Sequence, residues 1–577
     1  MSRVVRVLPD EPALDRDFDY LLPDRLTDTP HCPPIQVGTI VRVDLRGRRI
    51  RGWITAVDVD PPPGVDLREI TKVSSCGPPA ALVDLAAWAC RQWMGSRVHF
   101  LRTATHDRVV SSIPEPKRSR HVVSPSERLA EEAFRRRGAV VRTPPNSDDF
   151  VFAVAAASYG RALILTPTLA RAQRLAVALR RAGIEVAVFP RDWEAAAAGA
   201  VTIGARSAAW APIDDLDAVL VLDEHDESYQ QQSAPTWHAR DVVLERAKRD
   251  GAAWVIASPT PSLEALTCGA PLLTPDRAAE RAGWSVFDVV DLRDEPPLAG
   301  AWCSDTLSRQ LRHKRNVVCV LNRKGRARFA YCAQCGELAR SEVTGRPLGL
   351  DGKRLVHPID GDDRPAVCQS CSSTKFRRVK LGVTGVAEEL ERIARRPVGE
   401  VTSDTEAIDP EVELYVGTEA VLHRVERADV VVFLDFDQEL LAPRYRAAEQ
   451  AMSLLVQASR VVGRREDGGR VLIQTRIPQH PVLEAALSAD PSSLARTELG
   501  VRRELRQPPE AHWAIISGTA ATEFVRRIGT PAGLEITGPT SDRWRIRSDE
   551  REDLVAALKS VDRPPGRLRI EIDPLRA

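Results

Sequence analysis

The sequence lacks any long hydrophobic run. No stretch of about 18 consecutive apolar residues occurs among its 577 residues, so no transmembrane helix is predicted. The first residues, MSRVVRVLPDEP, contain no apolar segment of the kind that a secretory signal needs. We therefore expect a cytoplasmic protein that makes no membrane contact.

An excess of charge of one sign is also missing. The chain has 81 Lys and Arg against 80 Asp and Glu, for a formal net charge of +1. This balance excludes a polycation, so any contact with nucleic acid must come from local groups of arginines. Hydrophobic residues make up 43% and charged residues 28%, which is typical of globular proteins. The length favours roughly three to five domains.

The ten cysteines show no disulfide framework. Six of them have no regular spacing and are predicted to be reduced packing residues: Cys32, Cys76, Cys90, Cys268, Cys303 and Cys319. The other four form two CxxC pairs, Cys332 with Cys335 and Cys368 with Cys371. Two such pairs predict a structural zinc site of four thiolates, and a disulfide or redox pair is the alternative. We interpret His357, between the pairs, as a loop residue.

Apolar strands alternate with helices in two parts of the chain, over residues 162–257 and 386–474. Two of the strands, Ala218–Leu222 and Val430–Leu434, are apolar throughout. This pattern is typical of parallel sheets that are covered on both faces. The predicted fold class is therefore α/β, with two parallel-sheet lobes, a zinc-binding insertion, a β-rich N-terminal domain and a small C-terminal α+β domain.

Composition changes and proline-containing breaks suggest the domain boundaries. The predicted parts are an N-terminal domain (1–105), a linker (106–125), lobe 1 (126–275), lobe 2 (276–330 and 376–505), the zinc insertion (331–375) and a C-terminal domain (506–577). Within the first part, Thr39–Leu45 and Ile50–Val57 flank a basic turn and predict a hairpin. The turn contains Arg46, Gly47, Arg48 and Arg49. A solvated loop is one interpretation of this turn, and contact with phosphates is the one we favour.

An acidic run, Asp223-Glu224-His225-Asp226, directly follows an apolar strand. Walker B motifs place their Mg²⁺-binding carboxylates at such a position, although the run alone is a weak signal. Together with other segments in the same order, it resembles the PriA replication-restart family over nearly the whole chain. The matching segments are Phe18–Tyr20, Ile203–Ala208, Ser228-Tyr229, Pro235–Asp241, Pro259–Glu264, Leu321–Gly325, Gly417-Thr418 and Arg446–Glu449.

The resemblance implies two RecA-like lobes of a superfamily-2 helicase and an N-terminal domain that captures DNA 3′ ends. It implies an end-binding pocket of Phe18, Asp19, Gly47 and Arg68, although core packing is an equally good interpretation of Phe18. The implied partners are branched or single-stranded DNA with 3′ ends, primosome proteins and the loader of the replicative helicase. A single-stranded-DNA-binding protein is a further candidate partner. The family carries eight cysteines and this chain matches the outer four, so we expect one Zn²⁺ rather than two.

The chain departs from the family where ATP would bind. The family's GxxxxGK[ST] loop is replaced over residues 141–150 by VRTPPNSDDF, and no GK[ST] occurs elsewhere. Prolines lack the N–H groups that cradle phosphates, and carboxylates repel them. The family's GTQ and QxxGRxGR motifs also differ here, and Arg464 is the one arginine of the second motif that stays in register. We therefore expect neither ATP hydrolysis at motor rates nor DNA unwinding, and regard Asp223, Glu224 and Arg464 as remnants of the catalytic motifs. Weak binding of ATP and Mg²⁺ through the acidic pair Asp223 and Glu224 is the alternative.

Three hypotheses follow for function. The first is a PriA relative without motor activity that binds branched DNA at stalled forks and recruits the primosome. The alternative is an active ATP-dependent 3′-to-5′ DNA helicase with an atypical phosphate loop. The third is a protein-interaction scaffold that has also lost DNA binding.

Overall fold

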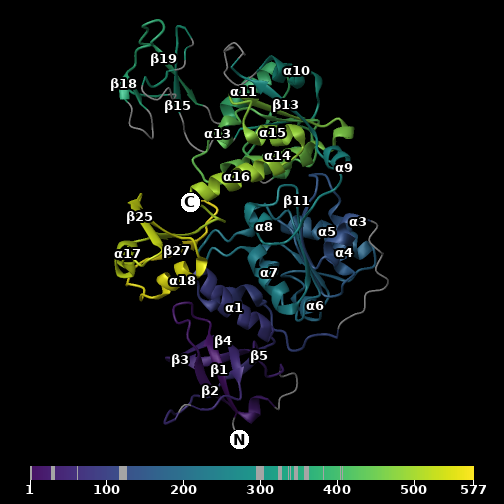
Figure 1. The fold of residues 1–577 in the computed structure, drawn as a ribbon, viewed down its shortest axis with the longest axis vertical. Coiled ribbons are helices and arrows are strands. Elements are labelled where there is room, and N and C mark those ends of the chain that lie inside the picture. Colours follow the sequence, from purple (N-terminus) through teal and green to yellow (C-terminus); the bar gives the residue numbers. More distant parts are fainter. Residues whose placement is uncertain are drawn as a thin grey trace. The chain divides into compact units, whose positions relative to one another are not determined.

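The computed structural model describes residues 3–27, 33–61, 63–115, 127–293, 304–321, 328–335, 337, 339–342, 348–356, 363–380, 383–402, 405 and 407–576. The chain divides into two compact units (Figure 1). The first contains Met1–Thr143, Ser147–Pro275 and Ala495–Ala577, and the second contains Pro144–Asn146 and Asp276–Leu494. No helix within the described ranges is long and apolar enough to span a bilayer.

The N-terminal part of the first unit is an antiparallel sheet of five strands in the order β2-β1-β4-β3-β5. Its strands are β1 (Arg3–Pro9), β2 (Phe18–Leu22), β3 (Ile40–Leu45), β4 (Arg48–Val57) and β5 (Lys72–Ser75). Alternate apolar residues such as Val5, Val7 and Val43 are fully buried, because successive side chains of a strand point to opposite faces of the sheet. Helices α1 (Ala80–Trp93) and α2 (Arg97–Ala104) follow.

The hairpin formed by β3 and β4 is tighter than the sequence predicts. Strand β4 begins at Arg48, so only Arg46 and Gly47 form the turn, with φ angles of 55° and 80°. A two-residue type I′ turn requires positive φ at both central positions, and glycine adopts that conformation easily. The prediction that Arg48 and Arg49 belong to the turn is therefore wrong, because both pair with β3 in the sheet.

The first unit also contains a seven-stranded sheet in the order β12-β6-β11-β10-β7-β9-β8, in which all neighbouring strands are parallel. Its strands are β6 (Gly138–Arg142), β7 (Ala162–Leu165), β8 (Val186–Val188), β9 (Val201–Gly204), β10 (Ala218–Leu222), β11 (Ala253–Ser258) and β12 (Leu272–Leu273). The α-helices between residues 127 and 275 are α3 (Arg128–Arg135), α4 (Asp149–Ala157), α5 (Leu169–Arg181), α6 (Trp193–Ala197), α7 (Ala239–Asp250) and α8 (Leu263–Leu266).

Both faces of this sheet are buried. In β10, Val219 and Val221 belong to the same apolar cluster as residues of α7, while Leu220 and Leu222 pack with residues of α4 and α5. Figure 1 shows these helices on the two sides of the sheet. The uninterrupted apolar sequence of β10 follows from this burial on both faces.

The second unit is built on a six-stranded parallel sheet in the order β13-β23-β22-β14-β21-β20. Its strands are β13 (Val286–Asp291), β14 (Val317–Val320), β20 (Gly399–Val401), β21 (Leu414–Gly417), β22 (Val430–Phe433) and β23 (Arg470–Thr475). The helices are α9 (Arg277–Ala282), α10 (Asp305–His313), α11 (Val383–Ala394), α12 (Val421–Arg424), α13 (Asp437–Leu440), α14 (Ala447–Val462) and α15 (Pro481–Ser488). The two parallel sheets confirm the predicted α/β class.

Two smaller β structures complete the described chain. Between β14 and α11 lie the pair β15 (Arg328–Cys332) and β19 (Phe376–Lys380), and the three-stranded sheet β16 (Gly349–Asp351), β17 (Arg354–Val356) and β18 (Asp363–Pro365). Helix α16 (Ser492–Glu504) leads to the C-terminal antiparallel sheet, in the order β25-β26-β24-β27. Its elements are β24 (His512–Ser517), α17 (Ala521–Ile528), β25 (Leu534–Thr540), β26 (Arg543–Ser548), α18 (Arg551–Lys559) and β27 (Arg569–Ile572).

Candidate functional site

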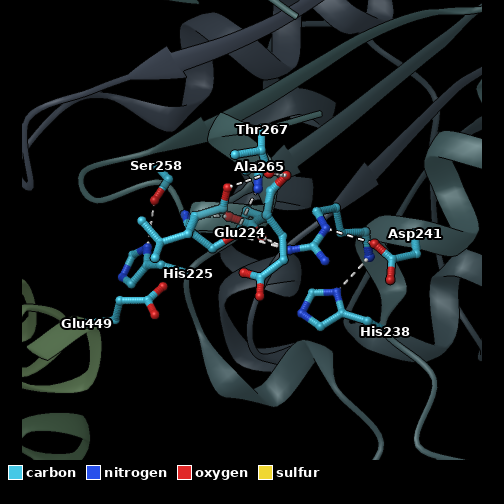
Figure 2. A network of polar contacts seen from close by, with 12 residues as sticks. Glu224, His225, His238, Asp241, Ser258, Ala265, Thr267 and Glu449 are labelled. Atoms are coloured by element: carbon cyan, nitrogen blue, oxygen red, sulfur yellow. Dashed lines mark hydrogen bonds and ion pairs between the residues drawn. The ribbon is translucent and has the colours of Figure 1, made fainter. Parts of the chain in front are cut away.

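Glu224 lies just beyond β10 and is almost completely buried. Its carboxylate accepts hydrogen bonds from Arg240 Nη1 at 2.5 Å, Ser262 Oγ at 2.7 Å and the Ser262 N–H at 3.1 Å (Figure 2). Burial raises the pKa of this carboxyl, but the positive charge of Arg240 and the Ser262 hydrogen bonds outweigh it and lower the pKa below its ordinary value. Glu224 is therefore a buried carboxylate whose two oxygens are both engaged within the protein.

Arg240, the cation that pairs with Glu224, makes further contacts of its own. It sits in the first turn of α7, is 7% exposed, and also donates from Nε to Asp241 Oδ1 at 2.8 Å. Its backbone N–H donates to His238 Nδ1 at 3.2 Å, which caps the helix. Figure 2 shows Glu224, His238 and Asp241 in one network of polar contacts. The carboxylates of Glu224 and Asp241 thus compensate the charge of the buried Arg240. Without such partners, burial of this charge would be strongly unfavourable.

Asp223, the other residue of the expected Walker B pair, is paired with Arg171. Its carboxylate accepts from Arg171 Nη1, and the Asp149 carboxylate accepts from Arg171 Nη2 and, at 2.8 Å, from Arg171 Nε. Asp223 is 3% exposed. Burial lowers the pKa of Arg171, but the two carboxylates outweigh burial and raise that pKa above its ordinary value. The sequence gives no local signal of this arrangement, because Arg171 lies on α5, far along the chain from both partners.

The N-terminus of α4 is the place where a phosphate-binding helix would begin. Here the side chain of Asp148 caps the helix, since its Oδ1 accepts the N–H of Phe150 at 2.9 Å. Asp149 follows in the first turn. Carboxylates stabilise a helix N-terminus in the same way as a bound anion does. The predicted loop also starts later than residue 141, because Val141 and Arg142 belong to β6.

The residues Pro144–Asn146 belong to the second unit. Arg460 Nε donates to the carbonyl of Pro145 at 2.9 Å, and Arg464 Nη2 donates to the carbonyl of Asn146 at 3.2 Å. The amide of Asn146 donates to the carbonyls of Gly283 and Ser459 at 3.2 and 3.3 Å. The remnant arginine Arg464 thus binds a backbone carbonyl within its own unit.

The four predicted zinc ligands come together beside the β15–β19 pair. The sulfur atoms of Cys332, Cys335, Cys368 and Cys371 all lie within 4.8 Å of one another. Cys332 Sγ lies 3.4 Å from Cys371 Sγ, and Cys335 Sγ lies 3.5 Å from Cys368 Sγ. A disulfide would need about 2.05 Å, whereas four thiolates at about 2.3 Å from one ion are about 3.8 Å apart. The set can hold one metal ion such as zinc.

Backbone N–H groups around the first cysteine favour its thiolate form. The N–H of Cys335, with a further contribution from that of Gln334, lowers the pKa of the Cys332 thiol to about 6. Thiolates rather than thiols bind metals. Cys368 is similarly held in a tight turn, because the N–H of Ser372 donates to its carbonyl at 2.9 Å. The predicted loop residue His357 falls outside the described residues.

In the N-terminal sheet, Asp44 links two of the predicted end-binding residues. Its Oδ1 accepts from Arg68 Nη1 at 2.5 Å and from the N–H of Gly47 at 3.1 Å. The hydroxyl of Tyr20 donates to the Asp44 carbonyl at 3.4 Å, and the N–H of Leu21 donates to the Arg68 carbonyl at 2.9 Å. Strand β2, the turn and Arg68 thus lie side by side. Sequence reasoning missed Asp44, whose only signal is its place just before the turn.

The other residues predicted to bind DNA in this region are partly buried in two cases and exposed in the rest. Asp19 accepts from Arg6 Nε at 2.8 Å across the β1–β2 pair, and Arg16 lies over the ring of Phe18 at 5.5 Å from its centroid. Both Phe18 and Asp19 are half-buried. The predicted phosphate-contacting arginines at the hairpin end are all exposed: Arg46, Arg48 and Arg49.

Known proteins resemble both this region and the whole chain. Residues 6–105 match the family model described as the 3′DNA-binding domain (3′BD). The Probable replication restart protein PriA of Mycobacterium leprae is 28% identical over 98% of this chain and 99% of its own. The chain is thus similar to a replication restart protein PriA over almost its whole length. Replication restart protein PriA of Bacillus subtilis is 26% identical over 63% of this chain, and this match spans 51% of that PriA.

Solved structures with related topology are more distant. RecG bound to a three-way DNA junction matches 65% of this chain and 46% of its own at 11% identity, with a TM-score of 0.36. Saccharomyces cerevisiae Dbp5 bound to RNA and ADP BeF3 matches 66% of this chain and 93% of its own at 11% identity, with a TM-score of 0.35. The description of two α/β lobes therefore rests on the parallel sheets of this chain itself.

One zinc equivalent per chain is the expected result of metal analysis on the purified protein. Cys368→Ser should lower it to a small fraction of that value, because three thiolates bind zinc far more weakly than four. The exposed Cys268, which lies outside the cluster, provides the matched control, and Cys268→Ser should retain the full equivalent. Two equivalents, or none, in the unaltered protein would contradict the single four-cysteine site.

Acid should weaken the first unit through His238. Burial, followed by the charge of Arg240, lowers the pKa of this histidine from 6.5 to about 4. His238 therefore binds a proton near pH 6.5 in the unfolded chain but only near pH 4 in the folded chain. The contribution of neutral His238 to the free energy of unfolding is complete above pH 6.5 and is lost as pH falls from 6.5 to 4. At pH 5 the loss relative to pH 7.5 is about 2 kcal/mol.

The variant His238→Asn isolates this effect, because asparagine also caps helices and does not titrate. Urea unfolding at pH 7.5 and pH 5, followed by tryptophan fluorescence, should show a smaller loss of unfolding free energy in the variant. Equal losses in the two proteins would show that His238 is not the group responsible.

Proposed function

We propose that this PriA-family protein binds branched DNA with 3′ ends at stalled replication forks and recruits the primosome, without acting as a motor. The observation that carries the DNA part is the match of residues 6–105 to a 3′DNA-binding domain. The proposal that it lacks motor activity is supported by the internal pairing of Asp223 and Glu224. The proposal that it recruits the primosome is supported by similarity to a replication restart protein over 98% of this chain.

The contacts in the N-terminal sheet suggest how a DNA end would be bound. Arg68 and the N–H of Gly47 converge on one carboxylate oxygen of Asp44, and these same two donors suit a phosphate oxygen. Asp19, paired with Arg6, offers the acceptor that a terminal 3′-hydroxyl needs. The exposed arginines Arg46, Arg48 and Arg49 would contact neighbouring phosphates without reading sequence.

Nucleotide hydrolysis needs groups that this chain uses elsewhere. A P-loop NTPase requires a lysine and free amides for the phosphates, and a carboxylate available to Mg²⁺. In this chain the carboxylate of Asp148 accepts a hydrogen bond from a backbone N–H at the α4 N-terminus, and the carboxylate of Asp223 is paired with Arg171. These residues do not fit a Mg²⁺–triphosphate. The alternative, an active 3′-to-5′ helicase, would require these ion pairs to open.

We place the protein in the cytoplasm, where forks and primosome proteins are found. The zinc insertion offers a rigid surface for protein partners, because four thiolates fix its two CxxC turns around one ion. A replicative helicase loader and a single-stranded-DNA-binding protein are the candidate partners. A scaffold that binds no DNA is the competing hypothesis, and fork binding separates the two.

Fork binding should be sensitive to salt and to the basic hairpin. The double variant Arg48→Glu, Arg49→Glu should weaken binding of a fork with a free 3′ end by about tenfold or more at 100 mM salt, and should reduce the slope of log K against log salt. Fluorescence anisotropy at several salt concentrations measures both. The exposed Arg135 and Arg136, at the C-terminal end of α3, provide the matched double variant, which should bind as the parent does. A parent protein that binds no fork at all would leave the scaffold hypothesis.

No phosphate release is expected when the protein is incubated with ATP, Mg²⁺ and single-stranded DNA, measured by malachite green. The physical reason is that the lysine is missing and Asp223 is already paired with an internal cation. Turnover that Asp223→Ala abolishes would establish the helicase alternative. Turnover that Asp223→Ala leaves unchanged would come from a contaminating enzyme.

A further inference from the structure

Arg171 connects the two elements between which a triphosphate and its metal ion would lie in an active relative. It sits in the first turn of α5, where its backbone N–H donates to the capping hydroxyl of Thr168 at 3.2 Å. Its side chain binds Asp149, at the start of α4, and Asp223, just beyond β10. The side chain of Arg171 is 21% exposed and that of Asp223 is 4% exposed. All of these residues belong to the first unit.

The charges explain why a cation is needed at this position. Asp223 is buried at the end of an apolar strand, and a buried carboxylate without a compensating charge is strongly unfavourable. In an active motor the ligand supplies that charge as Mg²⁺ and the phosphate loop supplies a lysine. This chain has no such lysine. A guanidinium attached to α5 is fixed in place and remains protonated at all physiological pH values.

We propose that Arg171 is an internal substitute for the metal ion and the phosphate-loop lysine, and that it holds the first lobe in one nucleotide-independent state. The substitution has two consequences. A Mg²⁺ ion cannot bind Asp223 without displacing a tethered guanidinium, and a triphosphate would meet Asp148 and Asp149 at the start of α4. The lobe therefore keeps its structure without ATP and does not respond to it. This inference rests on the proposed non-motor function and explains how a lobe built for a ligand persists without one.

The test measures thermal stability in the full chain. Arg171→Met removes the charge, keeps much of the length and leaves Asp223 buried without its cation, so its melting temperature should fall by about 5 °C or more. The matched control is Arg180→Met on the same helix, where the exposed guanidinium pairs with Asp192. This control should melt within about 2 °C of the parent.

A second variant keeps the test decisive if Arg171→Met folds poorly. The double variant Arg171→Met, Asp223→Asn removes both charges and should recover at least half of the loss. A single variant as stable as the parent, or a double variant no more stable than the single, would overturn the proposal. So would a melting temperature of the parent that rises on addition of Mg²⁺ and ATP.

Fork binding separates this inference from the proposed function. The double variant should bind a fork with the affinity of the parent, because Asp223 and Arg171 take no part in the proposed DNA contacts. If the melting results fail while the parent binds forks, only the role of Arg171 is wrong. If the parent binds no fork while the melting results hold, the proposed function is wrong and the role of Arg171 stands.

Discussion

The buried ion pair of Glu224 with Arg240 is the constraint on which the carboxyl edge of the first parallel sheet depends. It joins the turn after β10 to the start of α7, and Ser262 adds the start of α8 through two hydrogen bonds. Removing one partner would leave a charge in an apolar environment, which typically costs about 3–5 kcal/mol. Three separate connections of the chain are therefore fixed at one point.

Several residues in the segments that resemble the PriA family support the fold locally. Asp226 caps the short helix that follows it, by accepting the N–H of Ser228 at 2.9 Å. Tyr229, fully buried, donates to the carbonyl of Leu222 at 2.6 Å. Gly417 allows close pairing of two strands, since a Cβ there would lie 2.0 Å from the Val401 carbonyl oxygen. Each residue supports the fold locally, so its presence indicates descent more than catalysis.

The sequence predicts the features that depend on local pattern. The apolar strands β10 and β22 lie at or within one residue of their expected bounds, because burial on both faces leaves few residue types available. The four cysteines come together as their spacing predicts. The pairing of Arg171 with Asp223 could not be predicted, because it joins residues 52 positions apart and an arginine on a helix usually faces solvent. The role of Asp44 was missed for the same reason.

The carboxyl edge of the first sheet and the four-cysteine cluster lie in structures of very different size. The first parallel sheet buries large apolar clusters on both faces, so ion pairs between side chains are sufficient to hold together the elements at its carboxyl edge. Around the cysteines, the buried cluster formed by the described residues contains only five apolar side chains: Ala330, Ala339, Leu348, Leu355 and Ala366. So small a core supplies little stability by itself and needs a metal or another cross-link. The described part of the insertion therefore depends on a cross-link for its stability, whereas the first parallel sheet depends on its larger apolar clusters and on the internal ion pairs of Asp223 and Glu224.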